Sequence, residues 1–473
     1  MALAIFSEER RKWWTLAAVS FGLFMIMLDN TVVNVALPSI QEDLGATLSQ
    51  LQWIVTGYAL TFAALMLIGG KLADAYGRRL IFVIGIVIFT LASLWCGLSN
   101  TSEMLIMARI VQGAGAALMN PATLSIISAT FPPKQRGAAI GIWAGVSALA
   151  LAIGPLVGGL LTEHLSWHWI FFINVPVGML AIAATLLLVT ESKDETHESL
   201  DLPGLGTSAL GLFALTYGLI EANSYGWTSA RIVGSFAVAV VSLVSFVLIE
   251  RRRRYPMLDL TLFRSGTYTG ANVSMLLVAL SMFGVFFFVS LYMQNVLGYS
   301  AVQAGAAFLP MTVLIILIAP IAGRASDRFG SRWLMTIGMV LLSVQLLYFS
   351  QLTATSDFWN LLPGFILGGF GMAMAMTPTA AAATRAVPVH KSGVGSAVLN
   401  AMRQVGGSVG IALMGAIVAN QASGRPGVEG FMAGFERALI VAGVIAFLGS
   451  IVAFALVRQE SAEQAAAPAE LAA

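Results

Sequence analysis

Three charged residues lie within long apolar stretches of the chain, away from any loop: Asp29, Arg109 and Arg403. An ionised side chain inside a hydrocarbon layer costs several kcal/mol, so residues of this kind usually serve a function. A carboxylate beside a guanidinium can form an ion pair, and it can exchange a proton when that pairing or its contact with water changes. These three residues are therefore the first candidates for chemistry in this chain.

Asp29 and Arg109 are expected at similar depths in a membrane. Counted from the ends of their apolar stretches at about 1.5 Å per residue, the two depths differ by roughly 5 Å, which the side chains can bridge. The arginine favours the ionised carboxylate and burial disfavours it, so the carboxyl group can take up and release a proton as its access to water alternates. The alternative is a static ion pair that holds two helices together.

Arg403 has no acidic partner left in the apolar stretches. It could donate to backbone carbonyls exposed near Gly406, Gly407 and Gly410, or it could receive an anionic or hydrogen-bond-accepting part of a small molecule. The lack of a carboxylate deep in the apolar stretches after residue 268 argues against a dicationic ligand.

Polar and aromatic side chains in the apolar stretches could line a cavity, or they could bond and pack between helices. The candidates for a substrate cavity are Asn34, Gln112, Asn120, Phe287, Gln294, Asn400 and Arg403.

The composition is that of a membrane protein, and it excludes several other classes of protein and site. Of 473 residues, 58% are hydrophobic and 10% are charged, and the mean hydropathy is +0.86, whereas a soluble protein usually carries about 25% charged residues. The net charge of +2 argues against nucleic-acid binding. The single cysteine, Cys96, excludes an intramolecular disulfide. No glycine-rich loop ends in Gly-Lys-Ser/Thr and no histidines show metal-ligand spacing, so ATP-driven pumping and metal binding are not expected.

Stretches of about 20 apolar residues, enough to cross a bilayer as a helix, occur about fourteen times along the chain. The first, from Trp13 to about Leu37, is too long for a signal peptide, whose apolar region spans roughly 7–15 residues. Most of the 25 Lys and Arg residues fall in alternate loops, and the positive-inside rule assigns these loops and both termini to the cytoplasm. We therefore expect a multi-pass protein of the plasma membrane with both termini cytoplasmic.

One loop pattern occurs twice: Gly70 to Arg79 and Gly323 to Arg332 share glycine, aspartate, glycine and arginine at the same offsets. The repeat predicts an all-α integral membrane fold with two six-helix halves related by pseudo-two-fold symmetry and two inserted helices. The expected domains are a cytoplasmic N-terminal segment (1–12), the N-terminal half (13–190), a cytoplasmic linker (191–203), two additional helices (204–250), a basic cytoplasmic linker (251–267), the C-terminal half (268–457) and a cytoplasmic tail (458–473).

Two further motifs could control which side of the protein opens. In the repeated loops, carboxylates at helix starts and nearby arginines could form latches that break when the cytoplasmic side opens, or they could only fix the topology and the turn. The predicted latch residues are Gly70, Asp74, Gly77, Arg78, Arg79 and Asp327. The fifth apolar stretch contains Gly154, Pro155, Gly158 and Gly159, which predict a bent and closely packed helix.

These motifs resemble the major facilitator superfamily, specifically its fourteen-helix drug–proton antiporter family. Five patterns occur in that family's order: around Asp29, from Gly70 to Arg79, from Arg109, at Gly154-Pro155 and from Trp167 to Gly178. The loop from Gly323 to Arg332 matches more loosely, and the resemblance covers nearly the whole chain. The resemblance implies that Asp29 and Arg109 belong to the proton-coupled machinery, and that Gly154-Pro155 marks an exporter. The second loop pattern departs from the family because Ser331 replaces a basic residue and Ala325-Ser326 replaces Leu-Ala.

The sequence therefore predicts a proton-coupled secondary antiporter that exports amphiphilic drugs or other small molecules by alternating access. Its expected partners are a small-molecule substrate, protons and the lipid bilayer, with no nucleic acid. A proton gradient supplies the energy and no cofactor is expected; the chain is expected to act as a monomer and not as an enzyme. The alternatives are a dedicated exporter of one physiological metabolite and a non-transporting membrane receptor.

Overall fold

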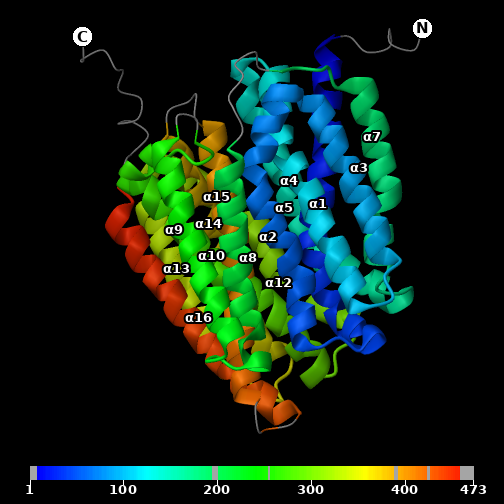
Figure 1. Ribbon diagram of the computed structural model, residues 1–473, viewed down its shortest axis with the longest axis vertical. Helices are drawn as coiled ribbons and strands as arrows, with labels where there is room; N and C mark the ends of the chain where they lie inside the picture. Colours follow the sequence, from blue (N-terminus) through cyan, green and yellow to red (C-terminus); the bar gives the residue numbers. More distant parts are fainter. Residues whose placement is uncertain are drawn as a thin grey trace.

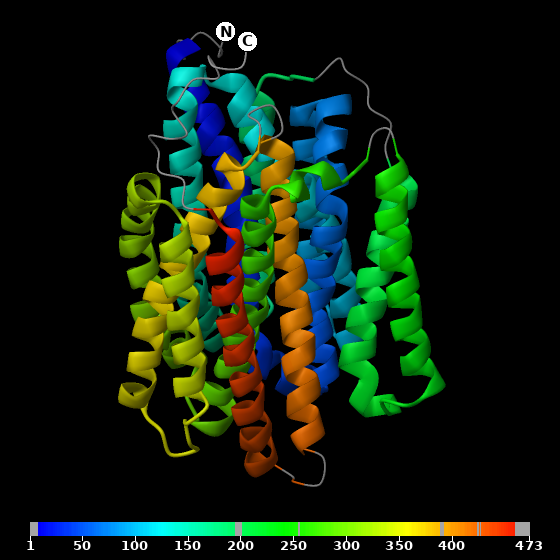
Figure 2. The ribbon, with the colours of Figure 1, turned by 90° about the vertical axis from the view of Figure 1, so that its left-hand side faces the viewer.

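The computed structural model describes residues 8–193, 201–253, 256–387, 392–422, 425 and 427–458. Within these ranges, fourteen helical stretches are long and apolar enough to cross a membrane, which confirms the predicted number (Figures 1 and 2). The predicted segments 1–12, 191–203, 251–267 and 458–473 lie partly outside the described residues.

The helices follow one another without a strand in the described part of the chain. The first group comprises α1 (Glu8–Leu44), α2 (Leu48–Tyr76), α3 (Arg78–Gly97), α4 (Ser102–Thr130), α5 (Pro133–His164), α6 (Trp169–Phe172) and α7 (Asn174–Leu188). Two helices follow, α8 (Leu202–Tyr225) and α9 (Ala230–Arg252). The last group comprises η2 (Leu260–Arg264), α10 (Gly266–Leu291), η3 (Tyr292–Val296), α11 (Ala301–Ala307), α12 (Leu309–Phe329), α13 (Arg332–Phe349), α14 (Phe358–Arg385), α15 (Ser392–Ala422) and α16 (Val428–Leu456).

Three spans differ from straight single helices of the predicted length. α1 runs through Pro38 to Leu44 and is longer than the predicted span, because an internal proline removes only one backbone hydrogen bond. α11 and α12 form one span that is interrupted at Phe308, where Pro310 occupies the first turn of α12. α10 ends in the π-helical turn η3, a feature that often occurs at functional sites.

The two groups of helices pack in the same pattern. In the first, α3 packs on α4, α1 on α5, and α7 on α1 and α3; in the second, α13 packs on α14, α10 on α15, and α16 on α10 and α13. Glycines repeat as well: a Cβ at Gly85 would lie 3.0 Å from the Gly115 carbonyl oxygen, and one at Gly338 would lie 2.9 Å from that of Gly371. Small residues at these equivalent positions let the paired backbones approach closely. The predicted pseudo-symmetric all-α architecture is confirmed.

The repeated loop pattern makes the same turn in both halves. Gly77 ends α2 with φ 124°, and Gly330 ends α12 with φ 81°. Glycine adopts these backbone angles without the steric cost that a Cβ brings. The repeated glycine therefore lets the chain turn directly into α3 and α13.

α1 begins and α16 ends at the same end of the bundle, which we call the terminal face; the opposite end is the distal face (Figure 1). α8 and α9 pair with each other at one side of the bundle, and α8 also packs on α2 and α15 (Figure 2). The halves meet where α2 packs on α15 and where α5 packs on α11 and α12. These two contacts are themselves related by the pseudo-symmetry, so the halves enclose a central interface.

Candidate functional site

The structure brings Asp29 of α1 and Arg109 of α4 into direct contact. Arg109 Nη1 lies 2.5 Å from Asp29 Oδ2, and both residues are only 1% exposed. Gln112, one turn after Arg109, completes the contact: it accepts from Arg109 Nη1 at 2.7 Å and donates to Asp29 Oδ1 at 3.0 Å. Both carboxylate oxygens therefore accept hydrogen bonds, as an ionised carboxylate does.

Neighbouring groups fix the orientation of the Arg109 guanidinium. Its Nε donates to the Ile54 carbonyl oxygen at 3.1 Å, and its Cζ lies 4.2 Å from the ring centroid of Tyr58. On the other side, the Phe171 ring centroid is 5.7 Å from Cζ. The Sγ of buried Cys96 lies 3.6 Å from Gln112 Oε1. These partners were not predicted from the sequence, because their contribution depends on how α2, α3 and α6 are rotated toward α4.

This network can exchange a proton only if it rearranges. A protonated Asp29 would leave the Arg109 charge without its counter-ion in a buried site, which is costly. Proton binding to Asp29 therefore favours a conformation in which Arg109 finds other partners or water. Such coupling between protonation and conformation is what the Asp29–Arg109 pair can contribute chemically.

The glycine–proline motif of α5 lies at two helix interfaces. A Cβ at Gly154 would meet Thr31, and one at Gly158 would lie 2.8 Å from the Val32 carbonyl oxygen, so these glycines face α1. On the other side of α5, a Cβ at Gly159 would lie 2.9 Å from Val302 Cα, and the Pro155 carbonyl packs beside Gly305. The motif therefore lets α5 approach α1 within its own half and α11 in the other half.

Hydrogen bonds that join the two halves gather near the distal face. Gln52 Nε2 donates to the Ile411 carbonyl oxygen at 2.7 Å, and Gln294 Nε2 donates to that of Val35 at 2.9 Å. Close to the same face, the Val302 amide donates to Glu163 at 2.8 Å, and Asn295 donates to Gln41 at 3.4 Å. A weaker contact between the halves, from Arg403 to the Met27 sulfur, lies at mid-depth.

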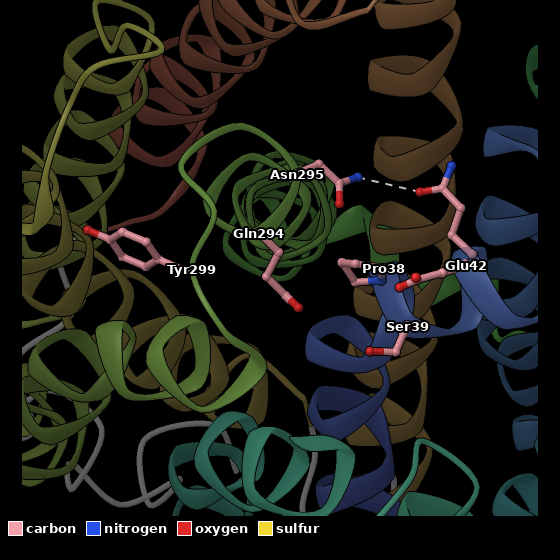
Figure 3. Close-up of a pocket in the computed structure, with 7 residues that line it drawn as sticks. Pro38, Ser39, Glu42, Gln294, Asn295 and Tyr299 are labelled. Atoms are coloured by element: carbon pink, nitrogen blue, oxygen red, sulfur yellow. Dashed lines mark hydrogen bonds between the residues drawn. The ribbon is translucent and has the colours of Figure 1, made fainter. Parts of the chain in front are cut away.

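A polar cleft of about 390 Å³ opens beside these bonds at the distal face (Figure 3). It lies between the end of α1 and the π-helical turn η3, and the Asn295–Gln41 hydrogen bond crosses it. Its lining residues are Pro38, Ser39, Gln41, Glu42, Gln294, Asn295 and Tyr299. Of the predicted cavity residues, Gln294 is the one that lines this cleft.

The predicted latch residues pair within their own halves in this structure. Asp74 Oδ1 lies 2.9 Å from Arg78 Nη2. Glu191 Oε1 accepts from the Arg79 backbone at 3.0 Å, and its carboxylate lies 3.8 Å from the Arg79 guanidinium. Gly70 packs near Pro121 of α4.

In the second copy of the loop, Asp327 pairs with Arg385 at 2.8 Å. Arg385 also donates to Ser326 at 2.9 Å and to Ser331 at 2.5 Å. The two serines that depart from the family pattern thus bind this arginine, so the second loop has its own polar anchor.

The remaining predicted cavity residues bond or pack within the helix bundle in this conformation. Asn34 donates to the Asn30 carbonyl oxygen at 3.1 Å, and Asn400 bonds within its own helix. Asn120 is 4% exposed on α4. Phe287 is fully buried with its ring centroid 4.8 Å from that of Phe288, so it packs in the core in this conformation.

Among the described residues, no hydrogen bond or ion pair joins Arg403 to the Asp29–Arg109 network. Arg403 Nη2 is 4.0 Å from the Met27 sulfur, and its buried Nε has no hydrogen-bond partner among the described residues. In the part of the chain that the structure describes, no backbone carbonyl accepts from Arg403, and the following glycines, Gly406 and Gly410, pack on the backbone of α10 at Leu276 and Leu280.

Two pseudo-symmetric helix bundles around a buried carboxylate–guanidinium network are typical of secondary transporters that open alternately to either side of a membrane. A sequence model of the Major Facilitator Superfamily matches residues 19–410 and 271–472. The tetracenomycin C resistance and export protein of Streptomyces glaucescens is 39% identical over 412 residues, covering 87% of this chain and 77% of that protein. The puromycin resistance protein of Streptomyces alboniger is 37% identical over 472 residues, covering 96% and 94%. The chain belongs to the Major Facilitator Superfamily and is a transport protein, not an enzyme.

Solved structures show the same fold at lower identity. A bacterial homologue of the human lysosomal transporter Spinster, in an inward-facing and unoccupied conformation, matches with a TM-score of 0.67 at 17% identity, covering 95% of this chain and 97% of that one. A POT family transporter in complex with 5-aminolevulinic acid matches with a TM-score of 0.68 at 14% identity, covering 92% and 94%.

Proposed function

We propose that this protein is a proton-coupled secondary antiporter that exports amphiphilic drugs or other small molecules by alternating access. The observation that carries the proposal is the buried Asp29 carboxylate, which is held by Arg109 and Gln112 in the middle of membrane-spanning helices. A proton gradient is the energy source, without a cofactor, and the functional unit is a monomer. Both termini lie in the cytoplasm of a plasma-membrane protein, so the terminal face is cytoplasmic.

The conformation of the protein supports a transport cycle. Hydrogen bonds between the halves gather at the distal face, as expected when the cytoplasmic side is the open one. In this conformation Asp29 is ionised and bound to Arg109, so the protein has released its proton to the cytoplasm and can load substrate. Opening of the distal face then lets substrate leave and a proton reach Asp29. The protonated protein then returns to the conformation that is open to the cytoplasm.

Several assignments depend on this cycle. The division into the halves 13–190 and 268–457, with helices 204–250 inserted, sets which parts move as units. Asp74 and Asp327, whose pairs with Arg78 and Arg385 lie within one half each in this conformation, exchange them for partners in the other half when the cytoplasmic side closes, and Gly154 to Gly159 let the helices close the distal side. Substrate passes the residues Asn34, Gln112, Asn120, Phe287, Gln294, Asn400 and Arg403 at the interface between the halves.

The relatives' names favour a role in export of toxic compounds, since they include resistance proteins for tetracenomycin C, puromycin and methylenomycin A. A dedicated exporter of one metabolite is the second candidate on the same scaffold. Competition between puromycin and an unrelated dye such as rhodamine 123 in one transport assay separates the two, because a dedicated exporter would ignore at least one of them. A non-transporting receptor would move neither.

The proposal is tested in proteoliposomes loaded with rhodamine 123, with an imposed pH gradient. Wild type should move the dye against its gradient and dissipate the pH gradient in step with the dye. Asp29→Asn should lose this coupling, whereas Asp43→Asn, which removes an exposed carboxylate of the same helix α1, should keep it. Transport that is independent of the pH gradient in wild type and in both variants would overturn the proposal.

A further inference from the structure

Arg403 is the one intramembrane charge of the three that the network around Asp29 does not satisfy. Arg109 has a carboxylate, an amide oxygen, a backbone carbonyl and an aromatic face as partners. Among the described residues, Arg403 has the weak acceptor sulfur of Met27 at 4.0 Å, and its buried Nε is unpartnered. A guanidinium has five N–H donors in a planar fork, so most of the donors of Arg403 remain available to a ligand.

The position of Arg403 between the halves makes it reachable by a substrate. Its side chain is half-buried and extends from α15 toward Met27 of α1. Arg403 therefore lies at the central interface at about the depth of Asp29, two residues beyond Met27, and not on the lipid-facing surface.

The charge balance of this interface is positive. Asp29 and Arg109 neutralise each other, and the described residues provide no ion pair for Arg403. No described backbone carbonyl accepts from Arg403, and Gly406, Gly407 and Gly410 pack α15 against α10. An unpaired cation in a poorly hydrated site is costly, and an anion that enters the site relieves that cost.

We propose that Arg403 binds an anionic group, such as a carboxylate or a phenolate, on the transported molecule, so that amphiphilic anions are preferred substrates. The planar fork of a guanidinium fits the two oxygens of a carboxylate, and charge-assisted bonds of this kind are stronger than neutral ones. The Met27 thioether, which lies next to the guanidinium, offers an apolar contact for the body of the molecule. This inference rests on the proposed export function and adds the class of substrate.

The test uses two dyes that share a xanthene core and differ in charge: fluorescein, which is anionic, and rhodamine 123, which is cationic. Proteoliposomes with wild type, Arg403→Gln and Arg403→Lys are compared. Arg403→Gln should lower fluorescein transport at least about tenfold and change rhodamine 123 transport less than about twofold, and Arg403→Lys should keep part of the fluorescein transport because the charge remains. Arg437→Gln, at an exposed arginine of α16, is the matched control and should change neither.

If Arg403→Gln folds, two results would overturn the inference. Equal loss of both dyes together with loss of proton movement would make Arg403 part of the coupling network, and unchanged fluorescein transport in Arg403→Gln would show that the cation does not bind substrate. If Arg403→Gln does not fold, saturable binding of fluorescein to wild type, measured by fluorescence anisotropy and weakened by salt, decides instead, and absence of that binding refutes the inference. Wild type that exchanges rhodamine 123 for protons while Arg403→Gln keeps fluorescein transport leaves the export proposal standing. Conversely, fluorescein binding that needs Arg403, in a wild type that exchanges no protons, supports the role of Arg403 and refutes the proposed antiport.

Discussion

Replacing Gly159 by alanine should weaken closure of the distal face. A Cβ at this position would lie 2.9 Å from both the carbonyl carbon of Ala301 and Val302 Cα, which belong to α11 in the other half. These neighbours are backbone atoms, so no side-chain rotation relieves the overlap. The contact exists only while α5 and α11 are together, so the substitution penalises the distal-closed conformation and spares the distal-open one.

The size of the effect follows from the cost of an extra methyl group in a close-packed contact. Overpacking typically costs about 1–3 kcal/mol, which corresponds to a shift of roughly 5- to 150-fold in the equilibrium between the two conformations. Gly145→Ala is the control, because this glycine lies on the same helix and, beyond its own turn of helix, none of the described residues has an atom within 4 Å of the position that its Cβ would take.

The shift can be measured by pulsed electron resonance between spin labels on Leu165→Cys and Trp359→Cys. Leu165 and Trp359 are 58% and 71% exposed, lie in different halves at the distal face, and can be labelled selectively because the native Cys96 is buried. Gly159→Ala should populate a longer distance that Gly145→Ala lacks. Identical distance distributions in the two variants, with equal thermal stability, would refute the role given to this motif.

Three further substitutions test the network and the repeated loops by thermal unfolding of purified protein. Arg109→Gln leaves the buried Asp29 charge unpaired and should cost about 3–5 kcal/mol, and adding Asp29→Asn should recover most of this stability without recovering proton coupling; equal stability of the single and double variants would contradict this. Gly77→Ala places a Cβ at φ 124° and should cost about 1–2 kcal/mol, unlike Gly141→Ala on α5. Ser331→Ala removes an acceptor of Arg385 and should cost about 1 kcal/mol; no change would mean that the serine does not anchor this arginine.

The spans of the fold were predictable from the sequence because they follow from composition and length alone. Continuous apolar stretches indicated the fourteen helices, and the repeat from Gly70 and Gly323 indicated the two halves. Which prolines interrupt a helix was not predictable: Pro38 lies inside the continuous helix α1, whereas Pro310 lies in the first turn of a new helix after Phe308. A proline's effect depends on whether neighbouring helices hold the chain on both sides of it.

The candidate site was predictable in part. The depths of Asp29 and Arg109 indicated the pair, and the three-residue spacing from Arg109 to Gln112 places both on one helix face. Tyr58 and Cys96 could not be found in this way, since their role depends on helix rotation. The sequence also left the partner of Arg403 open. The backbone carbonyls near the glycines that follow it were excluded as partners only by the structure, in which these glycines pack on α10.

The central claim is that Asp29 links substrate binding to proton release. The most direct measurement is the proton released when rhodamine 123 or fluorescein is added to purified protein in weakly buffered detergent solution with a pH indicator. Because substrate loads only after the proton has left Asp29, dye binding to protein that starts protonated must displace the proton. The account predicts release from such wild type, saturating with substrate binding, and none from Asp29→Asn that still binds the dye. Equal proton release from wild type and Asp29→Asn would contradict it.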